Sequence, residues 1–319
     1  MISFIACSCG KGTGTQTVSV TTNSYQKVSP DINADSAYHF VDKQVAFGPR
    51  VPNTQAHKEC GDYLVEQLTK FGAKVTEQKA DLKAYDGTIL HSRNIIGAYN
   101  PENSNRILLF AHWDSRPYAD QDPDEKLHKT PILGANDGAS GVGVLLEIAR
   151  IIQANPIDMG IDIIFFDAED YGVPAFSDLP SDGWCLGSEY WSKNPHVPNY
   201  KAKFGILLDM VGGADATFYK EYYSVNNARG VVENIWSTAR KLGYGKYFID
   251  KDGSSVYDDH IPVIQNRRIP CVDIIQHDPN MQHGFGWYWH TSRDDMDAIS
   301  KETLKVVGQT VLEVVYKEK

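Results

Sequence analysis

The sequence is poor in cysteine, in long apolar runs and in positive charge. Its five cysteines (Cys7, Cys9, Cys60, Cys185 and Cys271) are scattered and include no Cys-x-x-Cys pair. This spacing predicts neither a disulfide framework nor a zinc site built from thiolates. No run of residues is long and apolar enough to span a bilayer as a helix.

Acidic residues outnumber basic ones. The sequence has 41 aspartates and glutamates and 31 lysines and arginines, which gives a net charge of −10. This balance argues against nucleic acid and against anionic membrane surfaces as partners. An ordinary acidic surface explains most of the charge. Carboxylates concentrated in one site would in addition favour substrates that carry a free amine.

The N-terminus differs in composition from the rest of the chain. Residues 1–7 resemble the end of a bacterial lipoprotein signal, in which a short apolar run precedes an acylated cysteine. The run lacks a basic region and is short for such a signal, so a chance resemblance is the alternative. Residues 8–24 are rich in Gly, Ser and Thr, as in a tether. We therefore expect a tail (1–24), with Cys7 as a candidate lipid anchor in the bacterial cell envelope or periplasm, and a globular domain (25–319).

The globular part favours a single domain, because from about residue 31 onward it contains no linker, repeat or low-complexity block. Apolar runs predict strands, and apolar residues at helical spacing predict helices. Strands are expected at 73–78, 92–99, 107–112, 161–166, 205–208 and 271–276, and helices at 54–72, 136–152, 229–242 and from residue 300 onward. This alternation predicts an α/β fold with a largely parallel sheet covered on both faces.

Ionisable residues follow directly after several of these buried strands. They are His112, Asp114, Glu169, Asp170 and Asp209. In open α/β sheets, ligands bind at the carboxyl ends of the strands. Carboxylates and imidazoles gathered there without thiolates are typical of a hydrolytic zinc site. The pattern therefore indicates a metalloenzyme.

Each candidate residue also has a simpler explanation. Asp137, which precedes Gly-Ala-Ser, could cap the following helix. Glu169 and Asp170 could be solvated loop acids, and His290 could pack in an aromatic corner. Asp209 is harder to explain this way, because a buried carboxylate is costly unless it is paired or bound to a metal. The joint occurrence of these residues is what favours a metal site.

The order and setting of these residues resemble the M28 family of zinc aminopeptidases. The resemblance extends from about residue 47 to residue 304 and rests on His112, Asp137, Glu169, Asp170, Asp209 and His290. It implies a zinc-aminopeptidase-like fold, with a mixed and mostly parallel central sheet between helices, in a zinc-dependent catalytic domain. It also implies that Glu169 is a general base and that Asp137 bridges two zinc ions.

Further motifs are similar to one branch of that family, the animal-type glutaminyl-peptide cyclotransferases. They are Asp-Asp-His-Ile-Pro from Asp258, then Phe285, and Trp-His-Thr from Trp289. By matching positions, this resemblance implies one zinc ion with three ligands: Asp137, Asp170 and His290. The catalytic carboxylates would be Glu169, Asp258 and Asp209. The walls of an apolar pocket for the glutamine side chain would be Phe285 and Trp289.

Two features depart from the cyclotransferase pattern. The second acidic ligand is Asp170 where the animal enzymes have glutamate, so the backbone position must offset its shorter side chain. The loop after Asp170 does not align clearly onto the second pocket tryptophan of the cyclotransferases. Phe176 and Trp184 are both candidates for that position.

The expected reaction is that of an acyltransferase that converts the N-terminal glutamine of peptides or proteins to pyroglutamate and releases ammonia. We expect one zinc ion and a monomer. The alternative is an M28-type di-zinc aminopeptidase, in which His112 and Asp209 hold a second zinc and Glu169 activates water. A zinc-binding protein without catalysis is disfavoured, because Glu169 is not needed to hold the metal.

Overall fold

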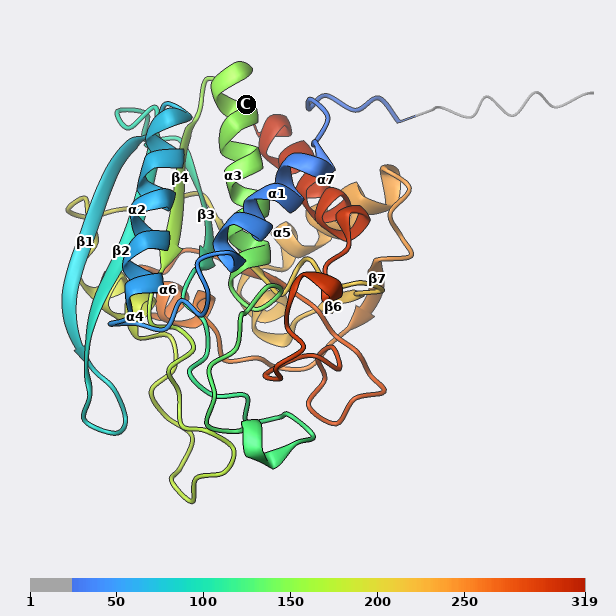
Figure 1. Ribbon diagram of the computed structural model, residues 1–319. Helices are drawn as coiled ribbons and strands as arrows, with labels where there is room; N and C mark the ends of the chain where they lie inside the picture. Colours follow the sequence, from blue (N-terminus) through green and yellow to red (C-terminus); the bar gives the residue numbers. More distant parts are fainter. Residues whose placement is uncertain (1–24, 319) are drawn as a thin grey trace, which may run out of the picture.

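The computed structural model describes residues 25–318, and its centre is a six-stranded sheet between two layers of helices (Figure 1). The strands of this sheet are β1 (Lys74–Lys83), β2 (Ile89–Tyr99), β3 (Arg106–His112), β4 (Gly160–Phe166), β5 (Gly205–Asp209) and β8 (Cys271–Ile275). Their spatial order is β1-β2-β4-β3-β5-β8. The predicted single α/β domain with a mixed, mostly parallel sheet is confirmed.

The strand directions decide where a site can form. Strands β4, β3, β5 and β8 run parallel, whereas β2 pairs antiparallel with both β1 and β4. The carboxyl ends of the four parallel strands therefore meet at one edge of the sheet, which is where α/β folds bind ligands. The long loops that follow β3, β4 and β8 gather at that end of the molecule, the lower end in Figure 1.

Helices cover both faces of the sheet in the described part of the chain. The larger layer consists of α1 (Ala34–Val45), α2 (Gln55–Lys70), α3 (Ala139–Ala154), α5 (Tyr222–Lys241) and α7 (Lys301–Lys317). The opposite face carries α4 (Leu186–Lys193) and α6 (His260–Arg267). Two 3-10 turns, η1 (Glu125–Leu127) and η2 (Met296–Ala298), and a separate parallel pair, β6 (Phe218–Lys220) and β7 (Phe248–Asp252), lie in the connections.

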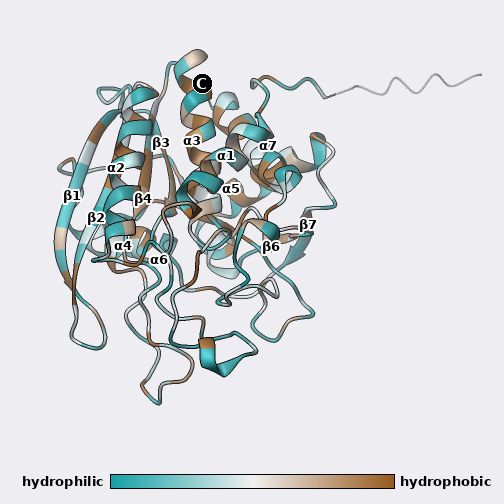
Figure 2. Cartoon of the chain, in the orientation of Figure 1, coloured by the Kyte–Doolittle hydropathy of each residue, from teal (hydrophilic) through white to brown (hydrophobic). Residues whose placement is uncertain are grey.

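Two hydrophobic cores form because successive residues of a strand point to opposite faces of the sheet. In β3, Ile107 and Leu109 enter the larger core, and Leu108 and Phe110 enter the smaller one beside Trp191 of α4. All residues of β3 and β4 are buried. Strands buried on both faces must be almost continuously apolar, which explains the runs that predicted them. Figure 2 shows these apolar residues along the central strands and the facing helices.

The structure extends several predicted elements and adds others. The strand expected at 73–78 continues to Lys83, because β1 pairs with β2 along its whole length. The helix expected at 229–242 begins earlier, at Tyr222, because the carboxylate of Glu221 accepts the first backbone N–H groups. Ala228, just before the predicted start, has non-helical angles (φ −140°, ψ 33°) and marks a kink. Helices α1, α4 and α6 and the pair β6–β7 were not predicted.

The predictions for the tail, including the lipid anchor at Cys7, lie outside the described residues. Between residues 25 and 318, no helix combines the length and the apolar character that crossing a membrane requires.

Candidate metal centre and active site

The predicted site residues come together at the carboxyl edge of the sheet. His112 ends β3, Asp209 ends β5, and Glu169 and Asp170 follow β4 within four residues. Around this point the structure has a cavity of about 230 Å³. Its lining includes Asp137, Glu169, Asp170, Trp184, Asp209, Tyr257, Asp258, Phe285, Trp289 and His290.

Three buried side chains at the cavity form a candidate metal centre. The ligand atoms of Asp137, Asp170 and His290 lie within 4.8 Å of one another. Nε2 of His290 is 3.5 Å from Asp137 Oδ2 and 3.5 Å from Asp170 Oδ1. Asp170 Oδ2 is buried and has no hydrogen-bond partner, which is costly unless a cation satisfies it. Two carboxylates and one imidazole fit a zinc ion and leave it an open position.

The protonation state of His290 fits the role of a ligand. Burial, reinforced by the charge of Arg116, lowers the pKa of His290 to about 4. The ring is therefore neutral at pH 7 and has a lone pair to offer. Its other nitrogen, Nδ1, lies 3.3 Å from Asp120 Oδ1. A carboxylate on the far nitrogen is the usual way in which proteins orient a metal-binding histidine.

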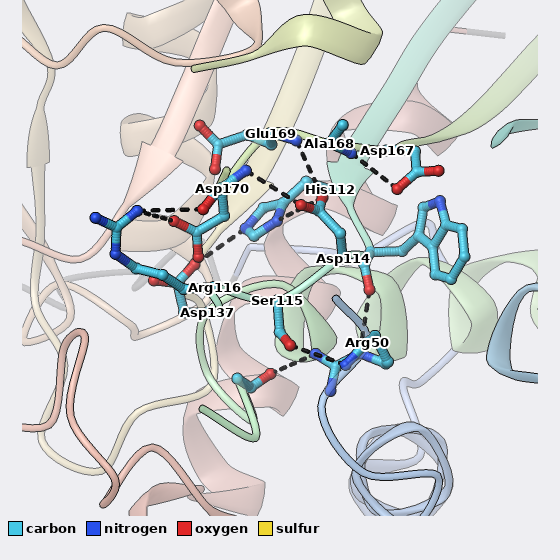
Figure 3. A network of polar contacts seen from close by, with 12 residues as sticks. Arg50, His112, Asp114, Ser115, Arg116, Asp137, Asp167, Ala168, Glu169 and Asp170 are labelled. Atoms are coloured by element: carbon cyan, nitrogen blue, oxygen red, sulfur yellow. Dashed lines mark hydrogen bonds and ion pairs between the residues drawn. The ribbon is translucent and has the colours of Figure 1, made fainter. Parts of the chain in front are cut away.

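Arg116 and Asp120 form a buried ion pair beneath the centre. The guanidinium of Arg116 donates to both carboxylate oxygens of Asp120, at 2.7 Å each. Arg116 Nη1 also lies 3.3 Å from Asp170 Oδ1 (Figure 3). The pair thus contacts His290 through Asp120 and Asp170 through Arg116. It fixes two of the three candidate ligands relative to each other.

Two further carboxylates hold the backbone of the candidate ligands. The side chain of Asp114 accepts the N–H groups of Glu169 and Asp170, both at 3.1 Å (Figure 3). The side chain of Asp294 accepts the N–H groups of Asn136 and Asp137, at 2.7 and 3.0 Å. The contacts of Asp114 fix the backbone of Asp170, and those of Asp294 fix the backbone of Asp137. They bridge loops that follow different strands.

Several residues at this edge have backbone angles that side chains rarely adopt. Ala168, Met210 and His290 have φ of 55°, 49° and 55°, and each is next to or part of the site. Gly138, with φ of 98°, follows Asp137, and a Cβ atom there would lie 2.5 Å from the carbonyl oxygen of Asp114. Such conformations cost free energy and persist where the surrounding contacts impose them. They aim the ionisable side chains into the cavity.

A second group of possible ligands lies beside the first. Nε2 of His112 is 3.1 Å from Asp137 Oδ1 and 3.1 Å from Asp209 Oδ1. Burial opposes the charged form of His112, but contacts with Asp114, Asp137 and Asp209 raise its pKa well above the usual value. An imidazolium can therefore bridge the two carboxylates. The same three side chains could instead hold a second metal ion.

The candidate proton carriers lie on the other side of the cavity. Burial raises the pKa of Glu169 well above its usual value, and the charges of Asp170 and Asp258 add to the rise. Burial and the charge of Asp209 raise the pKa of Asp258 to about 7. A ligand atom of Glu169 and one of Asp258 lie within 4.8 Å of each other and of Cys185. A carboxyl group with a pKa of about 7, as for Asp258, can accept and return protons near neutral pH, and the pKa of Glu169 is shifted in the same direction.

A model of peptidase family M28 matches residues 94–315, which is more than half of the chain. The chain belongs to peptidase family M28. Among its relatives, aminopeptidase YwaD of Bacillus subtilis is 31% identical over 277 residues, which are 84% of this chain and 54% of that protein. The chain thus spans about half the length of this relative. A glutaminyl-peptide cyclotransferase of Drosophila melanogaster is 24% identical over 80% of this chain and 73% of its own length.

Solved structures give higher similarity. A Zn-dependent exopeptidase of Parabacteroides distasonis is 63% identical, with a TM-score of 0.89 over 91% of this chain and 99% of that one. The glutaminyl cyclase of Bacteroides thetaiotaomicron, bound to N-acetylhistamine, is 59% identical, with a TM-score of 0.90 over 92% and 100%. The glutaminyl cyclase of Tannerella forsythia is 62% identical, with a TM-score of 0.89 over 91% of this chain and 100% of that one. The predicted resemblance to M28 proteins and to glutaminyl cyclases is confirmed.

The wall of the cavity in this M28 protein is aromatic. The rings of Phe285 and Trp289 lie 5.0 Å apart, and Trp289 stacks on His290 at 3.8 Å. Trp184 lies parallel to His290 on another side, with the guanidinium of Arg116 4.7 Å from its ring. Of the two candidates in the loop after Asp170, Trp184 therefore lines the cavity.

The structure also decides between the alternatives for Phe176 and for Asp137. Phe176 is 43% exposed and packs on Tyr118, and it does not line the cavity. Asp137 does not cap α3, because the cap position is Gly138 and no side-chain cap hydrogen bond is present there. The individual roles of the predicted site residues stay predictions.

Sequence reasoning missed the residues that support the site: Asp114 as a backbone clamp, Arg116, Asp120, Cys185 and Asp294. In the sequence, Asp114 stands out only as an acid after a strand. Its partners are backbone N–H groups of a distant loop, which no local pattern reveals. A signal did exist for Arg116 and Asp120, because two opposite charges four residues apart follow the His112 strand in an otherwise irregular loop.

Proposed function

We propose that this protein is a zinc-dependent glutaminyl-peptide cyclotransferase, which converts N-terminal glutamine to pyroglutamate and releases ammonia. Close structural relatives carry the name glutaminyl cyclase, at 59% and 62% identity over nearly the whole globular part. The observation that carries the proposal is the position of Asp258. This buried acid, with a pKa of about 7, lies beside Glu169 at the cavity that the candidate zinc ligands line.

A zinc ion held by Asp137, Asp170 and His290 would polarise the γ-carboxamide carbonyl of the substrate glutamine and favour the oxyanion that develops on it. The ring closes when the α-amine attacks that carbonyl carbon. The amine must lose a proton, and the departing nitrogen must gain one before it leaves as ammonia. The substrate supplies the nucleophile, so no activated water is required.

Glu169 is suited to both proton transfers. Its carboxylate lines the cavity next to Asp170, and its raised pKa lets it take the proton of the amine and return it to the leaving nitrogen. Burial raises the pKa of both Asp258 and Asp209, and the charge of Asp209 adds to the rise at Asp258. In this proposal the two acids act as a pair that shares one proton. The shared proton can donate a hydrogen bond to the tetrahedral centre.

The cavity suits a glutamine side chain. Its volume is about 230 Å³, and Trp184, Phe285 and Trp289 give it apolar walls. Rigid aromatic walls exclude water and hold a short side chain in one orientation, while an indole N–H can donate to a carbonyl. The acids at the same cavity attract the amino group of a free N-terminus.

The second candidate is an M28 di-zinc aminopeptidase. The observation in its favour is the cluster of His112, Asp137 and Asp209, which could hold a second ion beside the first. The relative from Bacillus subtilis carries the name aminopeptidase, and several structural relatives carry the names exopeptidase or leucine aminopeptidase. In that enzyme Glu169 would activate water, and Asp258 would have no direct role.

The two candidates predict different products and metal contents. Purified protein is incubated with glutaminyl peptides and, separately, with leucyl and alanyl arylamides, and its zinc is counted. Ammonia and pyroglutamyl peptide without cleavage, with about one zinc per chain, support the cyclotransferase. Cleavage of the arylamides with about two zinc ions per chain would support the peptidase instead.

A further inference from the structure

Cys185 is a buried thiol at the candidate base. It is fully buried, is not in a disulfide, and lies directly before α4. Its Sγ lies 3.4 Å from Glu169 Oε1, at hydrogen-bond distance for sulfur. Within residues 25–318, no other side chain donates a hydrogen bond to the carboxylate of Glu169.

The backbone around Cys185 is joined to the same segment. The N–H of Cys185 donates to the carbonyl of Glu169 at 2.9 Å, and the N–H of Leu186 donates to that of Ala168 at 3.0 Å. Both Cys185 and Ala168 have left-handed angles, with φ of 58° and 55°. Two strained residues thus face each other across a pair of hydrogen bonds. This backbone geometry places the thiol of Cys185 beside the carboxylate of Glu169.

A thiol has the right strength for this position. Burial and the charge of Glu169 raise the pKa of Cys185, so the sulfur keeps its proton and can donate it. The S–H group is a weak donor. It can fix the rotamer of a carboxylate without stabilising the anion strongly, whereas a charged donor such as lysine or arginine would stabilise the anion and make the carboxylate a poorer base. When Glu169 carries a proton on one oxygen, the other oxygen can still accept from sulfur.

We propose that Cys185 is a positioning residue, which holds the carboxylate of Glu169 in the orientation needed for proton transfer through a thiol–carboxylate hydrogen bond. The inference rests on the proposed function, in which Glu169 carries the proton. It predicts that loss of the thiol affects turnover and leaves substrate binding unchanged.

Two substitutions of nearly equal volume separate the hydrogen bond from packing. Cys185→Ala removes the donor, and Cys185→Ser keeps one. We expect kcat for pyroglutamate formation to fall about tenfold in Cys185→Ala, with KM within about twofold, and Cys185→Ser to recover most of the loss. Cys271→Ala, which removes another buried thiol, in β8, is the matched control and should leave kcat unchanged. Equal kcat values for the Ala and Ser variants would overturn the inference.

The infrared S–H stretching band tests the contact without activity. The difference spectrum between the wild type and Cys185→Ser identifies the Cys185 band. Glu169→Gln should move this band to higher frequency, because a neutral amide oxygen accepts more weakly than a carboxylate. A band that does not move overturns the inference, even in an active enzyme. Wild-type protein that forms no pyroglutamate overturns the proposed function, and with it the catalytic meaning of the contact.

Discussion

The environment of Glu169 gives this residue properties that an exposed glutamate lacks. It is almost fully buried, its pKa is raised, and its partner is a thiol. It is not one of the three candidate zinc ligands. Its side chain can therefore be changed without removing a ligand from the metal.

We expect Glu169→Gln to lower kcat by about 10²–10⁴-fold, because the amide cannot accept and return a proton. Zinc content measured by atomic absorption should stay at the wild-type value. A variant that retains more than half of the wild-type kcat would remove Glu169 from the mechanism. A variant that loses zinc would show that the side chain helps to hold the metal.

Two tryptophans close in sequence provide a test of the pocket. Trp289 lines the cavity, whereas Trp287 is 56% exposed and lies against Arg293. We expect Trp289→Ala to raise KM for a glutaminyl peptide about tenfold or more, since it removes an apolar wall worth about 1.5 kcal/mol or more. Trp287→Ala is the matched control and should leave KM within about twofold. Equal effects in steady-state kinetics would contradict the assignment of the wall.

At the scale of elements, the loop between β3 and α3 holds the candidate metal centre by a buried ion pair. Asp120 orients His290 and is itself held by Arg116. Burial opposes ionisation of Asp120, but hydrogen bonds from Arg116 and His290 lower its pKa below the usual range. The carboxylate is thus charged at every pH at which the enzyme would work.

We expect Asp120→Asn to weaken zinc binding about 10–100-fold, as loss of a carboxylate behind a metal-binding histidine does. The measurement is competition for zinc with a chromophoric chelator. Asp124→Asn, in the same loop but exposed at the start of η1, is the matched control and should bind zinc like the wild type. Unchanged zinc affinity in Asp120→Asn would contradict the assignment of His290 as a ligand.

The elements differ in how well the sequence predicts them. Strands β3, β4 and β5 are buried on both faces, so their apolar runs identify them. Strand β1 is largely exposed, and its second half becomes a strand only because β2 pairs with it. Helix α5 has a kink at Ala228. Its first turns, before residue 229, contain few aliphatic residues, so the sequence does not indicate them.

The same distinction applies to the site. The acids and histidines at strand ends stand out in the sequence, because a charged residue next to a buried strand is costly unless it is paired or bound to a metal. Asp120 and Asp294 look like solvated loop acids in the sequence, and Asp114 stands out only as an acid after a strand, which does not reveal that it clamps a distant backbone. They act on backbone N–H groups and on a ring nitrogen from segments 55 to 170 residues away, which come near only in the folded chain.

At the scale of the whole molecule, the start of the described chain is fastened to the last helix. The buried carboxylate of Glu313 in α7 accepts hydrogen bonds from the hydroxyl of Tyr25 at 2.6 Å and from the N–H of Ser29 at 2.8 Å. It also accepts the N–H of Val28. Burial opposes the charge of Glu313, but the bonds from Ser29 and Tyr25 lower its pKa below 4.5.

A carboxyl group with a lowered pKa stabilises the folded state above its unfolded pKa, and this contribution is lost as the pH falls through the folded value. We expect Glu313→Gln to lower Tm by a few degrees at pH 7, for a loss of about 2 kcal/mol. The difference from the wild type should shrink as the pH falls below 4.5. Tm is measured by differential scanning calorimetry. Glu302→Gln is the control, because Glu302 lies exposed in the first turn of the same helix. A difference in Tm that does not vary with pH would contradict this account.

The central claim is that Asp137, Asp170 and His290 hold one zinc ion in a cyclotransferase. The most direct test is titration of metal-free protein with zinc while ammonia release from a glutaminyl peptide is followed. We predict that activity reaches its maximum at about one zinc per chain and that leucyl arylamide stays uncleaved. Activity that appears only at two zinc ions per chain, together with arylamide cleavage, would contradict the claim.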